Sequence, residues 1–158
     1  QQLDQAYLTS DIAAAFAKSV NAYPRDRSFL SRMVYYGKEL YLKELLLPTA
    51  DDFQYINFTY DEYQWATENE RQVWRYFIEN ELLYSTDTKL DQRFLDPAPF
   101  SKFQLELIDS ESPGCIGRFI GWQIVRAFAK KNPDLTLIDL LDLPADELFK
   151  KSNYKPKK

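Results

Sequence analysis

Three of the four glycines in this chain, Gly114, Gly117 and Gly121, lie within the segment SPGCIGRFIGWQIVRAF, residues 112–128. The segment otherwise has the apolar spacing of a helix, and at 100° per residue the three glycines share one face. A glycine inside a helix costs roughly 1 kcal/mol relative to alanine, and close approach of another backbone is the usual compensation. The fourth glycine, Gly37, lies on the apolar face of an earlier expected helix. We therefore predict that the two helices cross with Gly37 beside Gly117 or Gly121.

The same glycines would also suit a phosphate cradle or the wall of a substrate groove. Phosphate cradles place their glycines in a loop between a strand and a helix. No strand pattern precedes residue 112, and Gly121 lies well inside the expected helix. A close helix crossing is therefore the preferred interpretation, and the other two remain alternatives.

Apolar periodicity and the placement of proline predict helices along the rest of the chain. The expected helices cover residues 3–20, 28–47, 68–84, 116–131, 135–143 and 144–152. Capping boxes that begin at Thr59 and Thr67 predict two helix starts close together. Residues 85–114, which hold three prolines, are expected to form a long loop, and such loops are often working surfaces. The predicted fold is all-α, a single compact multi-helix domain over residues 1–158 with a basic tail at 152–158.

The chain contains no histidine, which excludes the usual zinc enzymes and every catalytic triad with an imidazole base. With one cysteine, Cys115, it can form neither an internal disulfide nor a cysteine-based zinc site. The net charge is −4 with both signs interleaved, unlike a nucleic-acid-binding surface. No apolar run approaches the ~20 residues of a membrane span. We expect no cofactor, no metal and no nucleic-acid partner.

Four acidic residues, Asp61, Glu62, Glu68 and Glu70, precede the segment RQVWRYF. Paired carboxylates can bind a hard cation or perform glycosidic acid–base chemistry. Acidic residues near a helix start also complement the helix dipole, and this simpler interpretation is preferred.

Aromatic and basic side chains supply the remaining candidates for a binding site. Trp65, Trp74 and Trp122 would suit a carbohydrate or peptide groove, although their helical spacing favours packing in the core. Arg118 lies at the edge of the glycine face, where it would anchor a carboxylate or form a structural ion pair.

Several segments together resemble the GldB family of gliding-motility lipoproteins. They are RMVYYGKELYL, ENERQVWRYFIENELLYSTD, DPAPFSKF, SPGCIGRFIGWQIVRAF and SNYKPKK. The resemblance runs from about Leu30 to the end of the chain. In that family the Pro-Gly pair found here at 113–114 is usually followed by arginine, whereas this chain has Cys115.

The GldB family is itself similar to predicted zinc metallopeptidases, so the resemblance implies a gluzincin-like helical scaffold. It places Tyr36 where those peptidases have their third zinc ligand, and Ser10, Asp11 and Ala14 against their H-E-x-x-H motif. These residues cannot rebuild a zinc site. The resemblance thus implies a metal-free peptidase-like scaffold, the C-terminal part of a longer lipoprotein that faces the periplasm and is held in the cell envelope by an upstream lipid anchor.

The resemblance implies a non-catalytic protein of the cell envelope that supports gliding motility or surface-protein export. We expect it to bind a peptide or protein in a groove between the first two helices and the glycine-containing helix. The candidate binding residues are Tyr36, Lys38, Arg118, Glu70 and Trp74.

Two alternatives remain at this point. One is a carboxylate-dependent hydrolase of the glycosidase type around Glu68 and Glu70, which would place paired carboxylates in an open cleft. The other is a purely structural subunit, which would expose a large apolar patch. An apolar, aromatic groove without such a carboxylate pair would favour binding.

Overall fold

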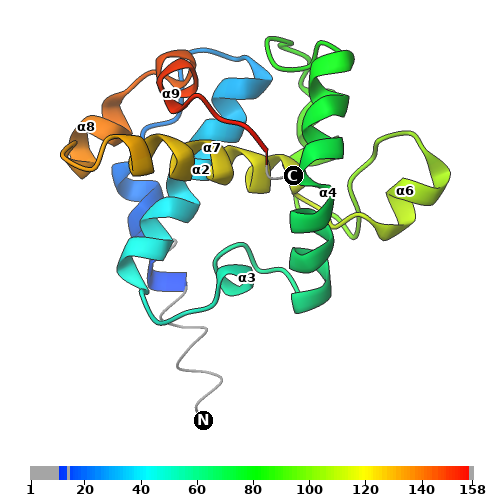
Figure 1. Ribbon diagram of the computed structural model, residues 1–158, viewed down its shortest axis with the longest axis horizontal. Coiled ribbons are helices and arrows are strands. Elements are labelled where there is room, and N and C mark those ends of the chain that lie inside the picture. Colours follow the sequence, from blue (N-terminus) through cyan, green and yellow to red (C-terminus); the bar gives the residue numbers. More distant parts are fainter. Residues whose placement is uncertain (1–10, 14, 157–158) are drawn as a thin grey trace.

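Helices are the regular elements of the computed structural model, which describes residues 11–13 and 15–156 (Figure 1). They are α2 (Phe29–Leu46), α3 (Asp52–Tyr55), α4 (Tyr60–Glu79), α5 (Lys89–Phe94), α6 (Glu106–Glu111), α7 (Ile116–Lys131), α8 (Leu137–Asp142) and α9 (Ala145–Ser152). Residues 11–13 and 15–20 are also helical. No strand occurs within the described ranges, and the all-α prediction is confirmed.

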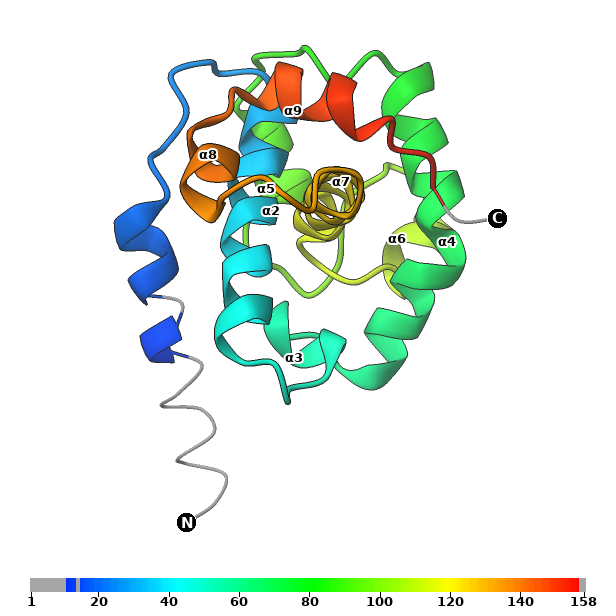
Figure 2. The same ribbon diagram turned by 60° about the vertical axis from the view of Figure 1, so that its left-hand side comes forward.

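The fold is organised around α7, which is seen nearly end-on at the centre of Figure 2, with α2, α9 and α4 around it. Its side chains Phe119, Trp122 and Phe128 are almost fully buried. A second aromatic group packs edge-to-face where α2, α4 and α5 meet, through Phe29, Phe77 and Phe94. The aromatic surplus of the sequence is therefore used largely in the core.

The predicted crossing of the two glycine-containing helices is confirmed in the contact of α2 with α7. A Cβ atom built on Gly37 would overlap the carbonyl group of Gly121 and lie 2.7 Å from the backbone nitrogen of Trp122. A Cβ atom on Gly121 would overlap the carbonyl of Met33. Since backbone lies against backbone here, neither position has room for a side chain.

The other two glycines make close approaches to different segments. A Cβ atom on Gly117 would lie 2.9 Å from Cδ2 of Leu95. Gly114 precedes the helix, and a Cβ atom there would overlap the carbonyl of Ala98. Cys115, between them, has a left-handed backbone with φ 59° and caps α7. The prediction that Gly114 shares a helical face with the other two is therefore wrong.

Helix α2 agrees with its prediction to within one residue at each end. The hydroxyl of Ser28 accepts a hydrogen bond from the backbone nitrogen of Ser31, which explains why the helix starts here. Leu45, in the last turn of the helix, is about half exposed.

Helix α4 begins eight residues earlier than predicted. Thr59 and Glu62 form the predicted capping box, with the Thr59 hydroxyl accepting from the Glu62 nitrogen at 3.2 Å. The second predicted start, at Thr67, is wrong because α4 continues through it. The Thr67 hydroxyl instead donates to the carbonyl of Tyr63 one turn earlier.

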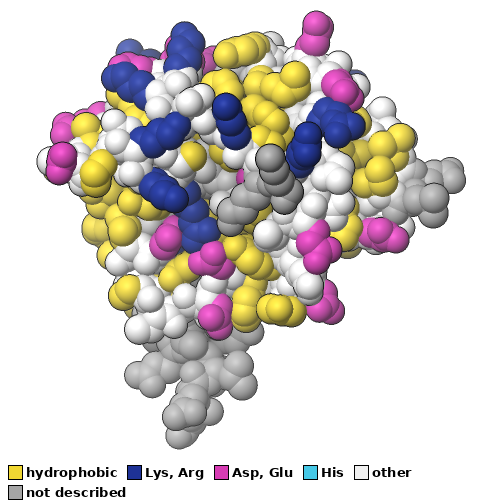
Figure 3. All heavy atoms as spheres, in the orientation of Figure 1, with side chains coloured by type: hydrophobic (Ala, Val, Ile, Leu, Met, Phe, Trp, Pro, Cys, Tyr) yellow, Lys and Arg dark blue, Asp and Glu magenta, His cyan; other side chains and the backbone are white. Residues whose placement is uncertain are grey.

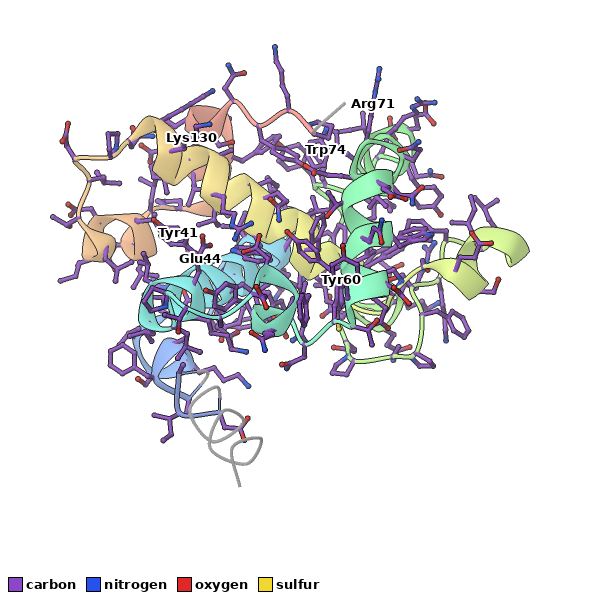
Figure 4. The ribbon with its side chains drawn as sticks, turned by 60° about the horizontal axis from the view of Figure 1, so that its bottom comes forward. Tyr41, Glu44, Tyr60, Arg71, Trp74 and Lys130 are labelled. Carbon is purple, nitrogen blue, oxygen red and sulfur yellow. The ribbon has the colours of Figure 1, made fainter. Side chains whose placement is uncertain are left out.

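A network of charged groups ties α7 to α2 and α3. The Arg126 guanidinium donates to both carboxylate oxygens of Asp52, at 2.8 and 3.0 Å, and to Glu44 at 2.9 Å. Glu44 also accepts from the indole nitrogen of Trp122, so it lies between α2 and α7 (Figure 4). The bidentate pair of Arg126 with Asp52 fixes the orientation of the two side chains as well as their distance.

Residues 85–114, predicted as a loop, contain the two short helices α5 and α6. Helix α6 projects from the body beside α4 (Figure 1). None of the described helices has the length and apolar character needed to cross a membrane.

Candidate functional site

The structure brings two of the predicted binding residues, Tyr36 and Arg118, into direct contact. The guanidinium carbon of Arg118 lies 3.9 Å from the centre of the Tyr36 ring, in a cation–π arrangement. The Nε atom of Arg118 donates to the carbonyl of Leu95, which fixes the stem of the side chain. Both residues line a small pocket of about 60 Å³ at the start of α7, together with Cys115. Burial raises the pKa of the Cys115 thiol and so opposes thiolate formation.

Lys38 is not part of that pocket. Its ammonium donates to the carbonyls of Leu141 and Leu143, both at 2.8 Å, at the end of α8. Burial lowers the pKa of Lys38 to about 8, although nearby Asp142 opposes the shift. Lys38 therefore caps the turn between α8 and α9, beside a separate pocket of about 440 Å³.

Glu70 and Trp74 form a third group, beneath the C-terminal segment. Glu70 is only 2% exposed and accepts a hydrogen bond of 2.7 Å from the hydroxyl of Tyr154. Trp74 lies where α4 meets this segment (Figure 4), with its ring centre 5.1 Å from that of Tyr154 and 5.7 Å from that of Phe149. Burial raises the pKa of the Tyr154 hydroxyl, and the Glu70 carboxylate adds to the effect. Together these contacts fasten the tail to α4.

The four acidic residues before RQVWRYF do not converge on one cleft. Glu62 is used in the capping box of α4, and exposed Glu68 accepts from the amide of Gln64 at 3.3 Å. Glu70 faces the interior, two residues and therefore about 200° further around the helix. Glu68 and Glu70 thus point away from one another.

An apolar groove lies between α4 and the segment 103–111. It has a volume of about 260 Å³. Its lining consists of Trp65, Asn69, Gln72, Val73, Arg75, Tyr76, Glu79, Phe103, Leu105, Ile108 and Glu111. Leu105 and Ile108 are 46% and 43% exposed, so their apolar surface is open to a partner. Figure 3 shows apolar side chains gathered on this side of α4, next to α6.

The far wall of this groove is held by hydrogen bonds to the backbone. The carboxylate of Asp109 accepts from the backbone nitrogens of Phe103 and Gln104, at 2.6 and 3.1 Å. The Tyr76 hydroxyl donates to the Phe103 carbonyl at 2.8 Å, which joins the segment to α4. Gln104 has φ 65°, the turn that sends the chain outward into α6. These hydrogen bonds therefore hold the wall of the groove in a defined position relative to α4.

Comparison with protein-family models matches residues 1–156 to the family described as gliding motility protein GldB. The chain belongs to the GldB family. No curated protein and no solved structure matches it. The resemblance noted in the sequence is confirmed, and the match extends over the N-terminal residues as well. Membership identifies this chain as a gliding-motility-related envelope protein of a lipoprotein family.

The positions aligned with a peptidase zinc site are only partly within the described residues of this GldB-family chain. Tyr36 stacks on Arg118, as above, and Asp11 is exposed in the N-terminal helical segment. Ser10 and Ala14 lie outside the described residues. Within 11–13 and 15–156, no group of three or more histidine, cysteine, aspartate or glutamate side chains is placed to hold a metal ion.

Four site residues of this GldB-family domain were not predicted from the sequence. They are Leu105 and Ile108 in the groove, and Glu39 and Lys43 in the small pocket. The sequence predicts only a long loop around Leu105. Glu39 and Lys43 lie in a helix and read as ordinary charged positions, yet each is only 7% exposed. A charged pair four residues apart on a largely apolar helix was the available signal.

Proposed function

We propose that this GldB-family domain is a non-catalytic binding domain of the cell envelope. It supports gliding motility or surface-protein export by holding a segment of a protein partner in the groove between α4 and α6. The occupant would be a short helix or extended segment that presents apolar side chains to Leu105 and Ile108 and polar groups to the rim. Arg75 and Glu79 at that rim offer charges of both signs.

The observation that carries this proposal is the open apolar wall of the groove. Leu105 and Ile108 expose a large share of their surface. Trp65 and Tyr76 of α4 add aromatic side chains to the lining of the same groove. Contiguous apolar surface with a polar rim is typical of protein-interaction sites. Aromatic side chains such as these are frequent binding hot spots.

The placement of the acidic residues supports binding over hydrolysis. Glu70 is sealed beneath Tyr154, and Glu68 points the other way into solvent. The groove lining does contain Glu79 and Glu111, so these two are the carboxylates that a hydrolase would have to use. Glu79→Gln and Glu111→Gln variants that still support gliding would favour the binding function.

The proposal is tested by adding a charge to the groove. Ile108→Glu places a carboxylate on the open apolar wall, whereas Ile138→Glu makes the same change on α8, where Ile138 is 71% exposed. Both variants are produced in gliding cells whose own copy has been removed. Ile108→Glu is expected to abolish or strongly reduce colony spreading at normal protein levels, and Ile138→Glu to preserve it. Equal spreading of the two strains would count against the groove.

A further inference from the structure

The small pocket at the start of α7 contains a buried carboxylate oxygen that has no hydrogen-bond partner among the described residues. The pocket lies among α2, the turn after α3 and the first turn of α7. It is lined by Tyr36, Glu39, Leu40, Lys43, Tyr55, Ile56, Asn57, Cys115 and Arg118. Glu39 is only 7% exposed, and its Oε2 atom has no hydrogen-bond partner among the described residues. Leaving a buried acceptor unsatisfied is costly, and more so when the group is charged.

Two cations at the same pocket keep unused hydrogen-bond donors. Lys43, also 7% exposed, donates to the carbonyl of Tyr55 at 3.1 Å. The other two of its three N–H groups donate to no described residue. Arg118 uses its Nε atom for the Leu95 carbonyl, and its two terminal nitrogens donate to no described residue. Stacking on Tyr36 holds the Arg118 guanidinium in place.

Burial disfavours the charged forms of Glu39 and Lys43. Burial raises the pKa of Glu39, and the neighbouring Lys18, Arg118 and Lys43 offset it only in part. Burial likewise lowers the pKa of Lys43. A ligand that supplies an acceptor to the cations and a donor to Glu39 would relieve both costs. Arg118 and Lys43 are both cations, so the main group of the ligand is an anionic acceptor.

We propose that this pocket binds a carboxylate group with an N–H donor on the adjacent carbon. The carboxylate accepts from Arg118 and Lys43, and the N–H donates to Glu39. The small volume admits only a terminal group, so the pocket takes the C-terminal end of a polypeptide or a free amino acid, which share this chemistry. This site is separate from the groove between α4 and α6 and goes beyond the function proposed there.

The ligand class is tested on the whole chain with four probes and no substitution. Acetyl-alanyl-glycine has the terminal carboxylate and its adjacent amide N–H, and its C-terminal amide lacks the carboxylate. Charge-assisted hydrogen bonds are worth roughly 1.5–3 kcal/mol, so the acid is expected to bind at least about tenfold more tightly than the amide. Glycine tests whether a free amino acid binds, and acetate tests whether a carboxylate alone is enough. Binding is measured by titration calorimetry and by protein-observed NMR.

The lone cysteine offers an independent readout, because Cys115 lines the pocket and no other thiol is present. Acetyl-alanyl-glycine is expected to slow alkylation of Cys115 by iodoacetamide, and the amide is not. Tighter binding of glycine than of the peptide assigns the site to free amino acids, and the reverse assigns it to polypeptide C-termini.

The role of Glu39 is tested by Glu39→Gln, with exposed Glu68→Gln as the matched control. Glu39→Gln is expected to weaken acetyl-alanyl-glycine by about tenfold, without weakening acetate, which has no N–H to donate. Glu68→Gln is expected to leave both affinities unchanged. The proposal is overturned if the acid and the amide bind wild type equally, or if neither the acid nor glycine binds or protects Cys115 at millimolar concentration. That comparison stands even if Glu39→Gln fails to fold.

Discussion

The backbone of Gly37 on α2 lies directly against the backbone of Gly121 on α7, so closely that a Cβ atom on either residue would overlap a carbonyl group. This contact sets the separation of the two central helices. Because α3, α4 and α9 all pack against this pair or against each other, the crossing also fixes the frame on which the groove and the small pocket are built.

The first prediction compares two glycines that would gain the same helix propensity on replacement by alanine. Gly37→Ala is expected to reduce the free energy of unfolding by at least about 2 kcal/mol, because the new methyl group meets rigid backbone. Gly117→Ala is expected to cost less, because its closest neighbour is the end of the Leu95 side chain at 2.9 Å and the nearest backbone atom, the Phe94 carbonyl oxygen, lies at 3.0 Å rather than in overlap. Urea denaturation measures both. Equal costs would contradict the account of the crossing.

A second prediction concerns where α4 begins. Thr59→Ala removes the hydroxyl that caps the first turn and is expected to cost about 1 kcal/mol of unfolding free energy. Thr67→Ala, inside the helix, is expected to change stability by less than about 0.5 kcal/mol. Thermal unfolding of the two variants separates them, and a larger loss for Thr67→Ala would restore the second helix start.

The third prediction concerns the contacts that hold the C-terminal segment against α4. Tyr154→Phe removes the hydrogen bond that Glu70 receives within the described residues while keeping the ring contact with Trp74. It leaves a buried carboxylate short of a donor, so the free energy of unfolding is expected to fall by about 1.5–3 kcal/mol. Adding Glu70→Leu to this variant should recover part of the loss. A double variant less stable than Tyr154→Phe alone would argue against this explanation.

A fourth prediction follows from the pKa of Lys38, which burial lowers from 10.5 to about 8 in the folded state. Between these two values the unfolded chain binds more protons, so the contribution of Lys38 to stability rises with pH. Below pH 8 the lysine is charged in both states, and above pH 10.5 it is neutral in both. A neutral amine keeps two N–H donors for the two carbonyls that it caps.

The measurement is the unfolding free energy of wild type minus that of Lys38→Met, taken by urea denaturation between pH 7.5 and 9.5. These values stay below the usual range of tyrosine titration. The difference is expected to increase above pH 8 by up to about 1.4 kcal/mol per pH unit. A difference that is flat or that falls with pH would contradict the buried, pKa-lowered lysine.

Local and periodic features could be predicted from the sequence. The helix class, the bounds of α2 and α7, the Thr59 cap and the Gly37–Gly121 contact all depend on spacing along the chain. The start of α4 was misplaced because Thr67 repeats the capping pattern of Thr59, and only packing decides that the helix runs through it. Gly114 was misassigned because the left-handed turn at Cys115 leaves no trace in apolar periodicity.

The binding surfaces could be predicted only in part, because they depend on contacts between distant residues. Tyr36 and Arg118 were expected near one another and are in contact. Lys38 reaches carbonyls more than 100 residues further along the chain, so its capping role has no local signature. The burial of the Glu39 Oε2 atom without a partner among the described residues depends on how the start of α7 covers α2, which no pattern within either helix reveals.

The central claim, that a protein partner occupies the groove between α4 and α6, is tested most directly by crosslinking in living cells. A photoreactive amino acid is placed at Ile108 in the groove or at Ile138 on α8, and the covalent products are identified by mass spectrometry. The account predicts one defined envelope protein crosslinked through Ile108, lost when Trp65→Ala is added, and absent from Ile138. The same products at both positions, or none at Ile108, would contradict it.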